Sequence, residues 1–249
     1  EDPTPAPPQP QPVMLAEEPR DPEHSRIVAA YGGVYDNPRA ARAIARAVGR
    51  LVAASDDPSV TYRITILDSP IINAFALPSG SLYVTRGLLA LANDTAEVAA
   101  VIAHEMAHVT ARHAFARARR GEAAQVVNRV VANVVQDREQ QRLAIASTQL
   151  SLARFSQVQE LEADAIGVKT LGRAGYDPFA AARFLTSMNR FANYRANRDA
   201  TDRMDFLSSH PSTPERINFA VRSAREIGAP GIGEQDRDAY LSGIDGLTF

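Results

Sequence analysis

The stretch His104-Glu105-Met106-Ala107-His108 lies inside a run with helical character, from Thr95 to Arg119, and it decides how the rest of the chain is interpreted. In an α-helix, residues four positions apart share one face, with Cβ atoms about 5–6 Å apart. His104 and His108 can therefore bind one metal ion, and Glu105 leaves the helix beside them, within reach of a water on that metal. The spacing predicts two metal ligands and a general base on one helix.

The residues before this motif favour a buried helix. Asp94 is placed to cap the helix, and Glu97, three residues later, completes a capping box. Apart from Glu97, all residues from Ala96 to Ala103 are apolar. The alternative is a core helix whose histidines only satisfy hydrogen bonds. Burying the ionisable Glu105 there without a partner is costly, and this favours the metal site.

A third ligand is predicted downstream, in the predicted helix from Phe155 to Asp164. Three protein ligands and a water are typical of a catalytic zinc site, and the absence of cysteine excludes a structural site built on thiolates. Glu160 would bind the metal, and Asp164, one turn later, would accept a hydrogen bond from the outer N–H of His104. Glu162 points elsewhere. The alternative is a solvated acidic patch.

The remaining histidines are less informative by position. His113 follows His104 by nine residues on the same predicted helix, so it is expected to point away from the ligand face and not to bind the metal. His24 lies in a polar N-terminal stretch. His210 lies on a predicted loop before Pro211.

Together these motifs resemble the gluzincin metallopeptidases of the CAAX prenyl protease type, the family that includes the bacterial HtpX and BepA branches. The resemblance covers roughly residues 25 to 225, and three further segments match in the family's order: Asn73–Gly80 running into Leu82–Leu89, Gly175–Pro178 and Ser209–Ile217. It implies a zinc endopeptidase with one zinc ion per chain, held by His104, His108 and Glu160, with Glu105 as catalytic base.

The resemblance also implies roles for His210 and Arg216. His210 is expected either to stabilise the oxyanion or to occupy the open zinc position and hold the enzyme latent; a structural histidine that caps its loop is the third alternative. Arg216, one turn into the next helix, would orient His210 or touch the substrate. The candidate edge strand that binds an extended peptide comprises Asn73, Ala74, Phe75 and Ala76. An ordinary buried strand is the alternative for that segment.

The pattern of the whole chain predicts an α+β fold that is mostly α, a zincin-like domain with a small β-sheet packed on the active-site helix. Cap residues and apolar spacing define the elements. Helices are expected from Asn37–Pro38 to about Ala54, over Glu122–Leu171 with a break near Ala144–Ser151, from Asp177–Pro178 to about Arg195, and, as the last helix, after the cap Thr213; strands are expected at Val60–Leu67, Ala74–Leu77 and Ser81–Thr85.

Composition fits a globular protein of 249 residues with a net charge of −2, and no basic stripe suggests nucleic-acid binding, so the expected partners are protein or peptide substrates. No segment has the roughly 20 apolar residues that a membrane helix needs. Three regions are predicted: a disordered, Pro-rich tether at 1–22, the metallopeptidase domain at 23–230, and a C-terminal segment at 231–249 that resembles a linker to a further domain.

The Pro-rich start favours a periplasmic protein, associated with the outer membrane through an N-terminal anchor outside this sequence. Two rival functions stay open. One is a latent or inactive metal-bound module with a chaperone-like role, against which the intact Glu105 argues. The other is a zinc hydrolase for a non-peptide substrate, against which the predicted edge strand argues.

Overall fold

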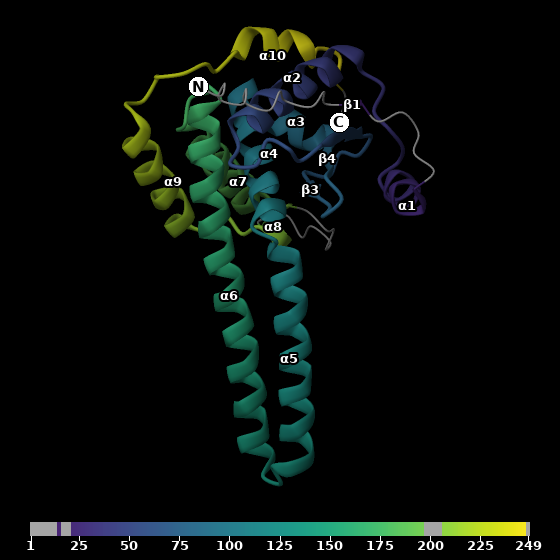
Figure 1. Cartoon of the computed structure of the whole chain (residues 1–249), viewed down its shortest axis with the longest axis vertical. Helices are drawn as coiled ribbons and strands as arrows, with labels where there is room; N and C mark the ends of the chain where they lie inside the picture. Colours follow the sequence, from purple (N-terminus) through teal and green to yellow (C-terminus); the bar gives the residue numbers. More distant parts are fainter. Residues whose placement is uncertain (1–13, 16–20, 197–205, 248–249) are drawn as a thin grey trace, which may run out of the picture.

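The computed structural model describes residues 14–15, 21–196 and 206–247, and helix α4 lies at the centre of the fold (Figure 1). The helices are α1 (Pro22–Ala30), α2 (Pro38–Ala54), α3 (Arg86–Leu91), α4 (Thr95–Thr110), α5 (His113–Val134), α6 (Arg138–Arg173), α7 (Ala180–Ala196), α8 (Phe206–Ser209), α9 (Pro214–Ile227) and α10 (Arg237–Gly243). The strands are β1 (Met14–Leu15), β2 (Arg63–Leu67), β3 (Ala74–Ala76) and β4 (Ser81–Thr85). The predicted mostly helical α+β fold is confirmed.

The strands form one sheet in the order β1-β2-β4-β3, in which β1, β2 and β4 are parallel and β3 is antiparallel to β4. Strand β3 is therefore an edge strand of the described sheet. Gly80 closes the β3–β4 turn with φ +85°, and a Cβ there would lie 2.3 Å from the carbonyl oxygen of Thr61. Of the three predicted strands, only the first differs noticeably, because β2 begins at Arg63 rather than Val60.

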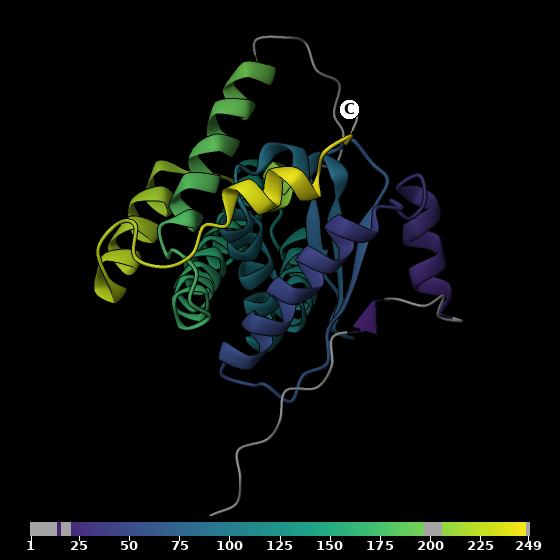
Figure 2. The same ribbon diagram turned by 90° about the horizontal axis from the view of Figure 1, so that it is seen from above.

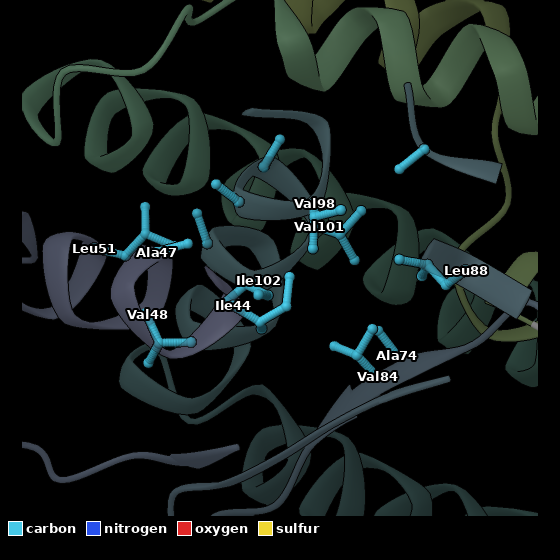
Figure 3. Packing of buried hydrophobic residues seen from close by; sticks show 14 of the residues in the cluster. Ile44, Ala47, Val48, Leu51, Ala74, Val84, Leu88, Val98, Val101 and Ile102 are labelled. Carbon is cyan, nitrogen blue, oxygen red and sulfur yellow. The ribbon is translucent and has the colours of Figure 1, made fainter. Parts of the chain in front are cut away.

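The core lies between α2, the sheet and α4 (Figure 3). Helix α2 presents an apolar face to α4, and fourteen of the sixteen α4 residues are buried. Full burial of each large aliphatic side chain contributes about 1.5–3 kcal/mol. Tertiary packing therefore fixes α4, and the motif that it carries, inside the molecule. The residues that Figure 3 labels are Ile44, Ala47, Val48, Leu51, Ala74, Val84, Leu88, Val98, Val101 and Ile102.

Helices α5 and α6 pack antiparallel and extend beyond the other elements as a long hairpin (Figure 1). Two predictions about this region are wrong. The run from Thr95 to Arg119 is two helices, because α4 ends at Thr110 and Arg112 has left-handed φ and ψ of 53° and 38°.

The predicted break near Ala144–Ser151 also lies elsewhere, between Val134 and Arg138. Asp137 caps α6 there by accepting hydrogen bonds from the backbone N–H groups of Glu139 and Gln140. Helix α6 runs without interruption through the predicted break, where the side chain of Thr148 donates to the carbonyl of Ala144, one turn earlier in the helix.

The prediction that the helix capped by Thr213 is the last one is wrong, because α10 follows α9 and packs beside the start of α2 (Figure 2). Tyr240 on α10 is buried and donates a hydrogen bond to the carbonyl of Leu89. The predicted domain boundary at 230 stays a prediction, but residues 231–247 pack on the preceding elements.

The predicted tether at 1–22 lies largely outside the described residues. Within it, Met14–Leu15 pair with β2, and Pro22 begins α1, so at these positions the structure differs from the predicted disorder. Among the helices described, none has the length and apolar character needed to cross a membrane.

Candidate metal centre

Four side chains from three parts of the chain converge on one point. His104 and His108 come from α4, Glu160 from α6, and His210 from the loop between α8 and α9. One potential ligand atom from each lies within 4.8 Å of all the others, and all four residues are buried. The Nε2 atoms of His104 and His108 are 3.0 Å apart, and Oε2 of Glu160 lies 3.3 Å from Nε2 of His104. The sequence predicted the first three residues as ligands, and the resemblance implied that His210 acts at the same site; the structure brings all four side chains together.

Close packing of α6 on α4 sets this geometry. Glu160, Asp164 and Gly167 follow at i, i+4 and i+7, on one face of α6. A Cβ at Gly167 would lie 3.2 Å from the backbone nitrogen of His104, so the two helices approach closely there. This contact brings the two carboxylates of α6 to the histidines of α4.

Asp164 and Arg216 support His104 from behind. Oδ1 of Asp164 lies 3.0 Å from Nδ1 of His104, an ion-pair distance, in an orientation that departs from ideal hydrogen-bond geometry. Arg216 donates from Nε and Nη2 to the two oxygens of Asp164, at 2.8 and 2.7 Å, and its Nη1 lies 3.0 Å from Oε2 of Glu160. Burial alone would raise the pKa of Asp164, but Arg216 and His104 hold it below its ordinary value.

The pKa values of the clustered groups are shifted in different directions. Burial opposes charge on His104, but the carboxylates of Asp164 and Glu160 raise its pKa to about 9. Burial lowers the pKa of His108 to about 3, so its ring is neutral near pH 7. Burial would raise the pKa of Glu160, yet hydrogen bonds with the three surrounding histidines hold it well below its usual range. An ionised carboxylate beside imidazole nitrogens is a donor set that zinc accepts.

Two carboxylate oxygens in the site lack hydrogen-bond donors within the described part of the chain. They are Oε1 of Glu105 and Oε1 of Glu160, both buried. A buried acceptor without a donor is costly, and a cation, or a water bound to one, would satisfy both. These residues therefore fit a metal ion. Oε1 of Glu105 also lies 3.6 Å from Nε2 of His210, so it faces the cluster.

His113 contacts the site in a way that the sequence did not predict. As expected, it is not among the four clustered ligands. The expectation that it points away was wrong, because the chain turns at Arg112 and brings Nδ1 of His113 to 2.8 Å from Nδ1 of His108. No pattern in the sequence reveals this, since a non-glycine residue gives no sign of left-handed backbone. His24, by contrast, lies outside the site, with Nδ1 2.9 Å from the hydroxyl of Tyr83.

A cavity of about 680 Å³ opens beside the cluster. Its lining combines the edge-strand segment with the motif helix, and includes Asn73, Phe75, Ala76, Glu105, His108 and His210. Ala74, the remaining predicted substrate residue, is buried and is not part of the lining. The side chain of Asn73 donates to the hydroxyl of Tyr31, so it holds the segment that follows α1 against the cleft.

Comparison with known proteins agrees with this arrangement. The family model of Peptidase family M48 matches residues 38–224. The chain is 32% identical over 171 residues to the "Mitochondrial metalloendopeptidase OMA1" of Arabidopsis thaliana, covering 69% of this chain and 33% of that protein. The OMA1 protein of Schizosaccharomyces pombe is 31% identical over 186 residues, which cover 70% of this chain and 50% of that protein.

The "Beta-barrel assembly-enhancing protease" of Escherichia coli K12 is 27% identical over 203 residues, covering 78% of this chain and 40% of that protein. The chain thus spans a third to a half of the length of these curated relatives. The resemblance predicted from the motifs is confirmed at the level of the family, and members of this metallopeptidase family use zinc.

Proposed function

Because the chain belongs to peptidase family M48, we propose that it is a zinc-dependent endopeptidase that hydrolyses peptide bonds in protein substrates. One observation carries the proposal: a buried cluster of His104, His108 and Glu160, with an unpartnered oxygen of Glu105, borders a cleft that an edge strand also lines. Proteins that only bind zinc for stability enclose it with protein ligands and need neither a free carboxylate nor a cleft.

In this proposal, His104, His108 and Glu160 hold the zinc ion. When bound, zinc supplies a Lewis acid and lowers the pKa of a coordinated water to about 7. Glu105 would accept a proton from the attacking water and pass it to the leaving amine. Its Oε1 suits this role because, in the described structure, this oxygen accepts no hydrogen bond. Asp164 and Arg216 keep the ring of His104 in its binding orientation.

His210 decides whether the enzyme is open or latent. Its Nδ1 lies 3.3 Å from Nε2 of His104 and 2.9 Å from Oε2 of Glu160, so it can serve as a fourth ligand. Catalytic zinc sites keep one position for water, which a fourth protein ligand fills. This geometry favours the latent state over a role limited to the oxyanion, and His210 must withdraw before substrate binds.

The substrate is proposed to bind as an extended peptide along β3. This strand pairs with β4 on one side, and within the described sheet no strand pairs with its other edge. Backbone groups of residues 74–76 can therefore hydrogen-bond a peptide, while Phe75 and Ala76 line the cleft toward Glu105. Phe75 is braced by stacking on Tyr83, with ring centroids 4.9 Å apart.

We also propose a periplasmic location, associated with the outer membrane. The support is the likeness to an Escherichia coli protease named for β-barrel assembly, together with the Pro-rich residues 1–12. The names of other relatives refer to the mitochondrion. Cell fractionation of the native protein tests the location, and recovery in the cytoplasm contradicts it.

Zinc content and casein cleavage, measured together on four proteins, test the proposed chemistry. Wild type should hold about one zinc ion per chain. Glu105→Gln should retain zinc and lose cleavage by about 10²–10⁴-fold. Glu160→Ala should lose zinc. The exposed Glu226→Gln, on α9, should change neither quantity, which makes it the matched control.

His210→Ala separates the two roles of His210. Increased cleavage supports the latch, and a large loss supports stabilisation of the oxyanion. If wild type holds zinc without cleaving casein, and His210→Ala is inactive as well, the inactive, chaperone-like module is favoured. A wild-type protein that binds no zinc contradicts the proposed function altogether.

A further inference from the structure

The proposed reaction does not use His113, although this residue lies deep in the protein beside a ligand. Its side chain is buried, and its Nδ1 is 2.8 Å from Nδ1 of His108, with the two rings nearly perpendicular at 75°. Its Nε2 lies 3.3 Å from Oε2 of Glu162 on α6. The side chain of Gln159 also donates to its backbone carbonyl, at 3.3 Å. Neighbours on both α4 and α6 therefore fix His113 in place.

The backbone bends between α4 and α5, and this bend brings His113 to its position beside His108. On a continuous helix, a residue five positions after His108 would point about 140° away from it. The chain instead leaves the helix after Thr110, passes through Arg112 at φ 53°, and starts α5 at His113. A left-handed conformation is strained for a non-glycine residue, and such strain persists where the surrounding structure requires it.

The three side chains form a chain of hydrogen bonds whose protons can be assigned. In the proposed function, His108 binds zinc through Nε2, the atom that faces His104 and Glu160. Its single ring proton must then lie on Nδ1. That proton points at Nδ1 of His113, which must accept it, so the proton of His113 lies on Nε2. This nitrogen faces the carboxylate of Glu162, an acceptor.

We propose that His113 is a positioning residue: resting on the proposed zinc function, it accepts the outer N–H of His108, and Glu162 fixes the tautomer in which it can do so. The arrangement does for His108 what Asp164 does for His104. Packing alone does not explain a histidine at this position, because an apolar side chain would fill the same buried space but would leave Nδ1–H of His108 unpaired.

The first test compares His113→Leu with His113→Asn, which have similar volumes. The amide oxygen of asparagine can take the place of Nδ1 and still accept from His108, whereas leucine cannot. The zinc dissociation constant, measured by competition with a chromogenic chelator, should rise about 10–100-fold for His113→Leu and less than about threefold for His113→Asn. The absorption of the cobalt-substituted protein should change for leucine and resemble wild type for asparagine.

The second test needs no variant, so it holds even if His113→Leu fails to fold. In the zinc-loaded wild-type protein, ¹H–¹⁵N NMR of the imidazole rings should show His108 protonated at Nδ1 and His113 protonated at Nε2. A proton on Nδ1 of His113 overturns the inference. The inference is also overturned if His113→Leu binds zinc as tightly as wild type, or if His113→Asn loses as much zinc affinity as His113→Leu. In each of these cases the proposed function still stands. A wild-type protein that binds no zinc overturns both.

Discussion

The two ends of α4 gather similar charges and use them differently. At the N-terminal end, one arginine contacts three buried carboxylates, and the group comprises Asp94, Glu97, Asp177 and Arg183. At the end that carries the motif, one arginine again lies among buried carboxylates, and the group comprises Glu105, Glu160, Asp164 and Arg216. Charge and burial alone therefore do not distinguish a structural cluster from a functional one.

The difference lies in what the carboxylate oxygens accept. At the N-terminal end, backbone N–H groups fill them: Asp94 accepts from the N–H of Glu97 at 2.8 Å, and Asp177 from that of Phe179 at 2.9 Å. Both hydrogen bonds belong to turns at the start of helices, so these two carboxylates act as helix caps. At the motif end, Glu105 and Glu160 each keep a buried oxygen without a donor, and imidazole nitrogens replace the backbone groups. A cluster becomes a metal site where carboxylate acceptors are left over and imidazole nitrogens join them.

The largest expected effect separates the two arginines by stability. Arg216→Met should lower the free energy of unfolding by about 3–5 kcal/mol, because it leaves buried Asp164 and Glu160 without their cation. Arg183→Met should cost less, because the side chain of Arg183 is 34% exposed, against 5% for Arg216, and water can replace part of its charge. Urea unfolding with a chelator present measures both.

The exposed Arg225→Met on α9 serves as the control and should change stability by less than about 0.5 kcal/mol. Equal losses for Arg183→Met and Arg216→Met would show that burial does not rank the two clusters.

A second prediction distinguishes the ends by metal affinity. Asp164→Asn should weaken zinc binding about 10–100-fold, because asparagine cannot provide the carboxylate that orients His104. Asp177→Asn removes an equally buried carboxylate from the other cluster and should leave the zinc dissociation constant unchanged. Competition with a chelator measures both variants. A loss of affinity in Asp177→Asn would mean that the clusters communicate through α4.

The sequence predicts the parts of this comparison that follow from helical spacing. His104 with His108, and Glu160 with Asp164, are pairs four apart, and such pairs share a face wherever the helix lies. Asp94 and Thr213 were identified as caps because capping is a local property, and both side chains do accept hydrogen bonds from their helices.

Other parts depend on how distant elements meet. Arg183 lies 89 residues from Asp94 in the chain, and no local pattern joins the two. The contact of His113 with His108 depends on left-handed backbone at Arg112, which the tertiary structure imposes on a residue without a preference for it. The clustering of the candidate ligands was therefore predictable from the sequence, and the placement of the residues around them was less so.

The smallest expected effect concerns the pH dependence of the N-terminal cluster. Burial raises the pKa of Glu97 above its ordinary value, and hydrogen bonds from Asn93 offset this only in part. A raised folded pKa means that the contribution of Glu97 to stability is fully present below the unfolded pKa of about 4.3 and is lost as the pH rises through the folded value. Relative to Glu97→Gln, wild type should therefore lose stability as the pH rises above the unfolded pKa of about 4.3, in urea unfolding with a chelator. The exposed Glu226→Gln should show no such trend against wild type. A trend of the opposite sign would mean that Arg183 outweighs burial at Glu97, and the cluster at this end of α4 would then stabilise its charges rather than merely tolerate them.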